Sequence, residues 1–454
     1  GAFNVGTGAT LDFNSGTHTL DAASSLTGLG TTQFSGATMA VNTAAIPQLT
    51  ITAGTAAINS ALAINTLNLS GGTLNGTGNT TISTAFNWSG GGLGGSGTFT
   101  TGALSTNILS GGGWKYLYDT VTLTNNGAMV LNGATGIYAY NAGAKTINNT
   151  GTWDIQTDAD TTYYLGTLTI NNSGSLTKSA GTLVSILNGL NNSGTVSVTS
   201  GTLQLDTDGG TGSHTHSGAF NVGTGATLDF NSGTQTITST GSVSGAGSLL
   251  VSVGTFNFNG SYSLTGDITV SGGTANFTPL TGAMSPPSLT ISNGTANFNV
   301  AVSTPTLNFT GGTLNGIAGA NTDNLIWSGG TLLGNLTLNS LGTGTLSGSY
   351  TKFIGDGTTA GTFANLGTIT DNSTGYALYL QADSLFANQG SYTLTTDAYF
   401  ETNAATAAIN NGGTFTKNGG AGVSYINPTF TNTGTVNVST GTLRLNNSYG
   451  GSSN

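Results

Sequence analysis

The chain has 454 residues, with 75 Gly, no Cys, only 6 Lys or Arg, 16 Asp or Glu, and a formal net charge of −10. This balance, with Arg444 as the single arginine, argues against binding to nucleic acid or to an anionic membrane surface, because both need clustered Lys and Arg. The absence of cysteine excludes disulfides and thiolate metal sites, and no stretch approaches the ~20 apolar residues of a transmembrane helix. Hydrophobic residues make up 36% of the chain and are regularly spaced, which favours a folded protein over a disordered one.

Read in order, the chain opens on a sequence that it later repeats. Residues 1–17, GAFNVGTGATLDFNSGT, recur letter for letter at 218–234, an offset of 218 − 1 = 217. Residues 194–203 recur in similar form at 434–443, an offset of 434 − 194 = 240. The sequence therefore predicts two modules in one continuous rod, 1–217 and 218–454. The second module is 240 − 217 = 23 residues longer, with the insertion between about 235 and 306.

A shorter period runs through both modules. A Ser-Gly-(Gly/Ala)-Thr turn returns about every 20 residues, and its Ser or Thr falls at Ser15, Ser35, Thr52, Ser70, Ser89, Ser110, Ser271, Ser292, Thr310 and Ser328. Between these turns, runs such as 66–69 (TLNL) alternate polar and apolar residues, which predicts strands with one inward and one outward set of side chains. No segment shows the 3.6-residue period of a helix.

Short strands at this spacing favour an all-β parallel β-helix, or β-solenoid, of about 20 residues per coil and roughly 23 coils. A propeller blade needs ~40–45 residues, and a sandwich has no reason to repeat every ~20. The 23-residue insertion is close to one coil, which would leave the register of later coils unchanged. Pairs of asparagines recur about one coil apart, at 148–149, 171–172 and 191–192, and predict side-chain ladders.

Several segments resemble very large bacterial secreted β-strand-repeat surface proteins, which are similar to adhesin and autotransporter-passenger regions. The segments are TLNLSGGTLNG at 66–76, FNWSGG at 86–91, GSLTK at 174–178 and SGTV at 193–196. The resemblance implies a right-handed parallel β-helix, secretion to the extracellular space or cell surface, and adhesive or fibre-forming roles. It transfers no catalytic residue, because its motifs are those of turns and core.

Charges that recur in both modules are candidates for a purpose, because charges are so scarce: Lys115, Asp119, Lys352, Asp356, Asp158, Lys178, Asp397 and Lys417. Asp158 and Lys178 are 20 residues apart, and so are Asp397 and Lys417. At one coil's distance each pair is predicted to form an ion pair between adjacent coils. Contact with a ligand or partner is the alternative.

Aromatic residues offer a second kind of site. Trp88 and Trp327 occupy matching positions before Ser-Gly-Gly, where an exposed ring would stack on a sugar and an inward ring would fill the solenoid interior. Tyrosines crowd the middle of module 1 and recur in module 2, which is compatible with an adhesive face or with ordinary strand residues.

Metal binding and catalysis have little support. Asp206 and Asp208 in Asp-Thr-Asp-Gly-Gly resemble part of a calcium loop, but residues 446–450 in module 2 lack both acids. Acids and bases do not cluster as a β-helix lyase or hydrolase would need. We therefore expect no enzymatic activity and no cofactor.

The expected function is a structural segment of a long extracellular or cell-surface fibre or adhesin, with end-to-end assembly into filaments as a further option. Its partners would be neighbouring modules or copies of itself, with surface glycans or matrix as additional partners. No nucleic acid partner and no membrane insertion of this segment are expected. The alternative is a glycan-binding surface module that uses the recurring Trp and Tyr residues.

Overall fold

A computed structural model describes residues 1–207 and 212–446. The chain forms two compact units: unit 1 comprises Gly1–Thr234 and Thr240–Ser244, and unit 2 comprises Gln235–Ser239 and Gly245–Asn454. The predicted parallel β-helix is confirmed, since the described residues contain strands and no helix, and the strands stack in parallel in about 21 turns. In the same residues no helix is long and apolar enough to cross a membrane.

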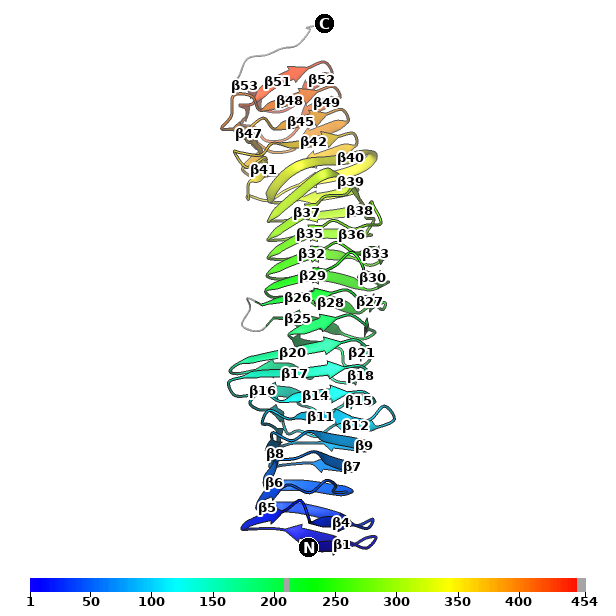
Figure 1. Cartoon of the computed structure of the whole chain (residues 1–454). Coiled ribbons are helices and arrows are strands. Elements are labelled where there is room, and N and C mark those ends of the chain that lie inside the picture. The colour runs from blue at the N-terminus through cyan, green and yellow to red at the C-terminus, as the bar shows by residue number, and fades with distance from the viewer. Residues whose placement is uncertain (208–211, 447–454) are drawn as a thin grey trace. The chain divides into compact units, whose positions relative to one another are not determined.

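Unit 1 contains the strands labelled up to β28 in Figure 1. They are β1 (Ala2–Asn4), β2 (Thr10–Phe13), β3 (Thr17–Leu20), β4 (Ser25–Thr27), β5 (Thr31–Val41), β6 (Gln48–Ile58), β7 (Leu62–Leu69), β8 (Thr73–Gly76), β9 (Thr80–Trp88), β10 (Gly92–Leu93), β11 (Thr98–Thr101), β12 (Thr106–Leu109), β13 (Lys115–Leu117), β14 (Thr122–Asn125), β15 (Ala128–Leu131), β16 (Ile137–Ala139), β17 (Ala144–Asn149), β18 (Thr152–Ile155), β19 (Thr161–Tyr163), β20 (Thr167–Asn172), β21 (Ser175–Lys178), β22 (Val184–Asn188), β23 (Leu190–Asn192), β24 (Thr195–Val198), β25 (Thr202–Asp206), β26 (Ser213–His216), β27 (Ala219–Val222) and β28 (Thr227–Phe230).

Unit 2 contains the later strands, and β29 (Thr234–Ile237) and β30 (Ser242–Gly245) include residues of both units. The later strands are β31 (Ser248–Val251), β32 (Thr255–Phe258), β33 (Ser261–Leu264), β34 (Ile268–Val270), β35 (Thr274–Phe277), β36 (Ser288–Ile291), β37 (Thr295–Phe298), β38 (Val302–Phe309), β39 (Thr313–Trp327), β40 (Gly330–Leu346), β41 (Lys352–Ile354), β42 (Gly361–Asn365), β43 (Thr368–Asp371), β44 (Tyr376–Leu380), β45 (Leu385–Asn388), β46 (Ser391–Leu394), β47 (Tyr399–Thr402), β48 (Ala408–Asn411), β49 (Thr414–Lys417), β50 (Val423–Ile426), β51 (Thr429–Asn432), β52 (Thr435–Val438) and β53 (Thr442–Leu445).

Much of each unit has three strands per turn. In unit 1, β14 pairs in parallel with β17, β17 with β20, and β20 with β23. In unit 2 the same step of three strands joins β42, β45, β48 and β51. Turns are unequal: stacked side chains are 18 residues apart at Thr50 and Asn68 and 24 apart at Asn125 and Asn149. The longer turns explain why the predicted 23 coils exceed the 21 observed.

The additional residues of the second module lie in stacked strands. Residues 31–58 form two coils, because β5 pairs directly with β6. Their equivalents run from 31 + 217 = 248 to 58 + 240 = 298 and form three coils, since β31 and β32 pair with β34 and β35, which pair with β36 and β37. The difference is one coil.

The alternating sequence buries every second side chain, as in β24, β32 and β49. Inward rings of neighbouring coils stack directly, with centroids 4.8 Å apart for Phe277 and Phe298. The turn motif follows from close backbone packing: Gly72 has φ +65°, and a Cβ there would lie 2.6 Å from the Gly54 carbonyl oxygen. The second glycine of Ser-Gly-Gly is therefore required by both φ and space.

Candidate functional site

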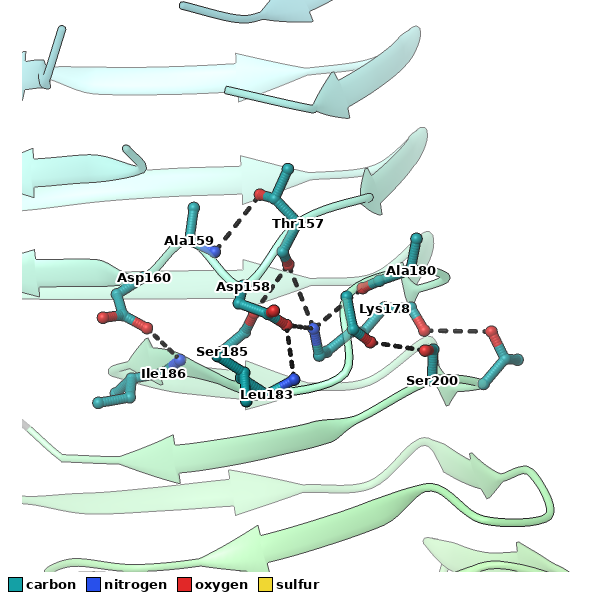
Figure 2. A network of polar contacts seen from close by, with 12 residues as sticks. Thr157, Asp158, Ala159, Asp160, Lys178, Ala180, Leu183, Ser185, Ile186 and Ser200 are labelled. Carbon is teal, nitrogen blue, oxygen red and sulfur yellow. Dashed lines mark hydrogen bonds and ion pairs between the residues drawn. The ribbon is translucent and has the colours of Figure 1, made fainter. Parts of the chain in front are cut away.

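The Asp158 and Lys178 side chains meet between two coils of unit 1, as Figure 2 shows. Lys178 ends β21, and its fully buried Nζ lies 2.9 Å from Asp158 Oδ1 in the turn after β18. The same Nζ donates to the Thr157 and Ala180 carbonyl oxygens at 3.2 and 3.0 Å. One ammonium group thus ties together the backbone of two successive turns and one carboxylate.

Unit 2 contains the same arrangement around Lys417 and Asp397. Lys417 Nζ lies 2.8 Å from Asp397 Oδ1 and donates to the Thr396 and Gly419 carbonyl oxygens at 3.0 and 2.8 Å. Asp397 also accepts from the Gly422 amide at 3.0 Å. The structure therefore brings together both pairs that were predicted from the 20-residue spacing.

These contacts change the pKa of each carboxyl group. At Asp158 partial burial opposes ionisation, but the hydrogen bond and charge of Lys178, with backbone donors, outweigh it and lower the pKa. At Asp397 the hydrogen bond from Lys417 is the main cause of a lowered pKa. Both groups are therefore carboxylates at neutral pH and keep the buried ammonium ions compensated.

Neither Lys115 with Asp119 nor Lys352 with Asp356 forms an ion pair in the described residues, so a direct pairing within these recurring sets is corrected here. The lysines begin β13 and β41 and point inward, whereas each aspartate follows its strand at an outer turn. Lys115 Nζ donates to the Thr135 carbonyl oxygen at 3.0 Å, and burial lowers its pKa to about 8. Asp356 accepts from the amides of its own turn.

All five lysines of the chain are buried. Lys145, which sequence reasoning did not single out, donates to the carbonyl oxygens of Asn141 and Gly143. Lys352 lies near the Tyr350 carbonyl oxygen at 3.3 Å, and burial lowers its pKa, opposed by the charge of Asp371. Lysine here serves turn carbonyls inside the solenoid, so these five cations are not available as a surface for acidic partners.

The predicted asparagine ladders are confirmed. Inside unit 1, Asn125 donates to Asn149, Asn149 to Asn172, and Asn172 to Asn192, each at 2.7 Å. All four are buried. Outside the same strands, Asn148, Asn171 and Asn191 form a second, exposed ladder. Unit 2 repeats the inner ladder in a list of its own: Asn365, Asn388, Asn411 and Asn432.

A buried Asp371–Tyr392 pair has no counterpart in module 1. Tyr392, fully buried, donates its hydroxyl to Asp371 Oδ2, while the Ser373 amide donates to Oδ1 at 2.8 Å. Burial raises the pKa of Asp371, and burial together with Asp371 raises the pKa of Tyr392 well above its ordinary value. The aligned residues of module 1 are Leu131 and Trp153, so both partners are apolar there.

Replacing Tyr392 by Phe alone is expected to cost about 1–3 kcal/mol at pH 7, because Asp371 then stays buried without its hydroxyl donor. Replacing both, as Asp371→Leu with Tyr392→Phe, is expected to be neutral or stabilising. The folded-state pKa of Asp371 is raised, so its native state is favoured at low pH and penalised as pH rises through that pKa. The advantage of the double variant should therefore grow from pH 4 to pH 7 in urea unfolding. A constant difference would contradict this.

The structure corrects the proposed sugar-stacking role of Trp88 and Trp327. Both side chains are fully buried, with their indole N–H groups donating to the Gly91 and Gly329 carbonyl oxygens. Trp88 stacks on Phe86 with centroids 5.4 Å apart. The inward parity of Phe86 and Trp88 around outward Asn87 is a sequence signal that indicates this placement.

The tyrosines of module 1 do gather on an outer face, above β13, β16 and β19. Tyr116 stacks on Tyr118 at 5.7 Å, and Tyr140 stacks on Tyr164 at 5.8 Å. Tyr140 is 44% and Tyr164 61% exposed. Tyr164 also borders a shallow hollow of about 500 Å³ whose polar lining includes Asn188 and Asp206.

The weak calcium candidates give no assembled site. Asp206 accepts from Asn231 Nδ2 at 2.9 Å and lies 3.3 Å from Gln204 Nε2, whereas Asp208 lies outside the described residues. Across residues 1–207 and 212–446, no three His, Cys, Asp or Glu side chains gather in a way that would hold a metal ion.

Comparison with protein-family models, with curated proteins and with solved structures finds no match for this chain. What the chain does is therefore inferred from its own residues.

Proposed function

We propose that this chain is a structural segment of a long extracellular or cell-surface fibre built from tandem β-solenoid modules. The observation that carries the proposal is the use of polar groups to join successive coils. The inner asparagine ladders and the Lys178–Asp158 and Lys417–Asp397 pairs connect each coil to the next. Such contacts between coil neighbours stabilise a stack that can be extended by adding coils.

Immunogold labelling of intact cells of the source organism tests this function. Antibodies raised against the chain should decorate fibres or matrix outside the cell, and permeabilised cells should show no large additional intracellular pool. Label confined to the cell interior would contradict the proposal. This readout does not depend on whether purified copies bind one another.

A second candidate function, binding of a neutral glycan, is favoured by the outer tyrosine face. Exposed rings such as Tyr140 and Tyr164 can cover the apolar face of a sugar ring, while Asp206 and Asn188 in the adjoining hollow can bind its hydroxyls. The five buried lysines leave no cationic surface nearby for an acidic glycan. This candidate no longer includes Trp88 and Trp327.

Tyr164→Ala is expected to weaken binding to neutral glycans on an array about tenfold, because one stacked ring contributes on the order of 1 kcal/mol. Tyr140→Ala should act in the same direction. Tyr350→Ala, which removes a 76% exposed tyrosine in unit 2, is the matched control and should leave binding unchanged. Equal loss in all three variants, or no glycan bound by the unaltered chain, would contradict this second candidate.

A further inference from the structure

The repeated 17-residue sequence occurs in two different environments within unit 1. In the second copy, Phe220 and Leu228 are fully buried and Phe230 is 1% exposed. In the first copy, the equivalent Phe3 is 39% exposed, and Leu11 and Phe13 are only half-buried. Identical side chains are therefore covered in one place and uncovered in the other.

The cover of the second copy is the coil formed by β24 and β25. β24 pairs with β27 in parallel, with Val196 opposite Phe220, and β25 pairs with β28, with Leu203 opposite Leu228. Backbone amides of Ala219 and Thr227 complete the contact with the Gly194 and Gly201 carbonyl oxygens at 2.9 and 3.0 Å. Among the described residues, β1 pairs only with β4 and β2 only with β5, so no such coil covers the first copy.

The covering sequence is itself repeated in unit 2. Residues 194–205 read GTVSVTSGTLQL, and residues 434–445 read GTVNVSTGTLRL, which form β52 and β53. In unit 1 the inward Val196, Val198 and Leu203 are fully buried. In unit 2 the equivalent Val438 is 49% exposed, and Val436 and Leu443 are half-buried. This coil also has an uncovered apolar side.

We propose that β52 and β53 of one copy of the chain pack on β1 and β2 of a second copy, in the register that β24 and β25 take on β27 and β28. The inference rests on the proposed fibre function and names its partner. The register places Val436 opposite Phe3, Val438 opposite Val5 and Leu443 opposite Leu11. Both uncovered surfaces become buried by a contact that the chain already makes once within unit 1.

Charge complementarity selects the same partner. The register that sets Gln204 opposite Asp229 sets Arg444 opposite Asp12. Both side chains point outward and are exposed, so they would meet at the surface of the seam. Arg444 is the one arginine of the chain, and Asp12 lies in the one strand whose register matches it. A partner of unrelated sequence would have neither the strand register nor this charge.

Charge reversal in the whole 454-residue chain tests the seam. Sedimentation velocity of the unaltered chain should show concentration-dependent association. Asp12→Arg sets two cations, and Arg444→Asp two anions, across the seam, so each variant alone should associate about tenfold or more weakly. An equimolar mixture of the two variants should recover association, because every seam then joins opposite charges. Asp267→Arg, the same charge change at an exposed position, is the matched control.

Cysteine cross-linking tests the register independently, since the chain has no cysteine of its own. The seam places Asn437 opposite Asn4, as Ser197 lies opposite Asn221. Asn437→Cys mixed with Asn4→Cys should give a disulfide-linked heterodimer on oxidation, and Asn437→Cys mixed with Asp12→Cys should give little. A monomeric unaltered chain, mixtures of charge variants that stay dissociated, or equal cross-linking of both cysteine pairs would overturn the proposal. Surface labelling of fibres would then still stand, so the seam and the fibre function fail separately.

Discussion

Asn172→Ala is expected to lower the free energy of unfolding by about 3 kcal/mol, because it interrupts the buried ladder of unit 1. Asn172 accepts from Asn149 and donates to Asn192 and to the Thr195 carbonyl oxygen at 3.1 Å. Its loss leaves at least two buried polar groups without a partner, at about 1–3 kcal/mol each. Urea unfolding gives the total, and amide hydrogen exchange in β17, β20 and β23 locates it.

Asn171→Ala is the matched control for this result. Asn171 is the adjacent residue on β20 and belongs to the exposed ladder, where water replaces a lost partner. Its substitution is expected to cost under about 1 kcal/mol. Asn388→Ala should reproduce the large loss in unit 2, since Asn388 accepts from Asn365 and donates to Asn411. Similar losses at Asn171 and Asn172 would refute the idea that burial decides the ladder's contribution.

Lys178→Met is expected to destabilise unit 1 by about 3 kcal/mol. The substitution preserves the length of the buried side chain but removes the donor shared by Asp158 and two carbonyl oxygens. Removing one partner of a buried pair costs about 3–5 kcal/mol, and the lower end applies because the Asp158 side chain is 27% exposed. Unfolding can be followed by the fluorescence of buried Trp153 in β18. Arg444→Met, at an exposed cation, should cost far less.

The pH dependence of the same site has a definite sign. The folded-state pKa of Asp158 lies below its unfolded value, so the pair contributes fully above about pH 4 and its contribution is lost as pH falls through the folded-state pKa. The destabilisation by Lys178→Met should therefore shrink below pH 4. A difference that stays constant down to pH 2 would show that Lys178 acts through packing alone.

The sequence predicted contacts best where they depend on the length of one coil. A separation of 20 residues became a distance of 2.9 Å between Lys178 and Asp158, because parallel stacking turns one coil of sequence into ~4.8 Å of space. It failed for Lys115 and Asp119, which are close in sequence but divided between an inward strand position and an outer turn. Asp371 and Tyr392 could not be paired in advance, since only the packed interior places a carboxyl beside a hydroxyl three strands away.

By itself, the sequence determined the architecture: alternating runs, Gly-containing turns and a ~20-residue period specify stacked coils whatever their neighbours are. Only the tertiary structure decided which side chains are covered. Residues 1–17 and 218–234 are identical, yet Phe3 is exposed where Phe220 is buried. The physical reason is that burial in a solenoid depends on the adjacent coils, whose presence a coil's own residues do not encode.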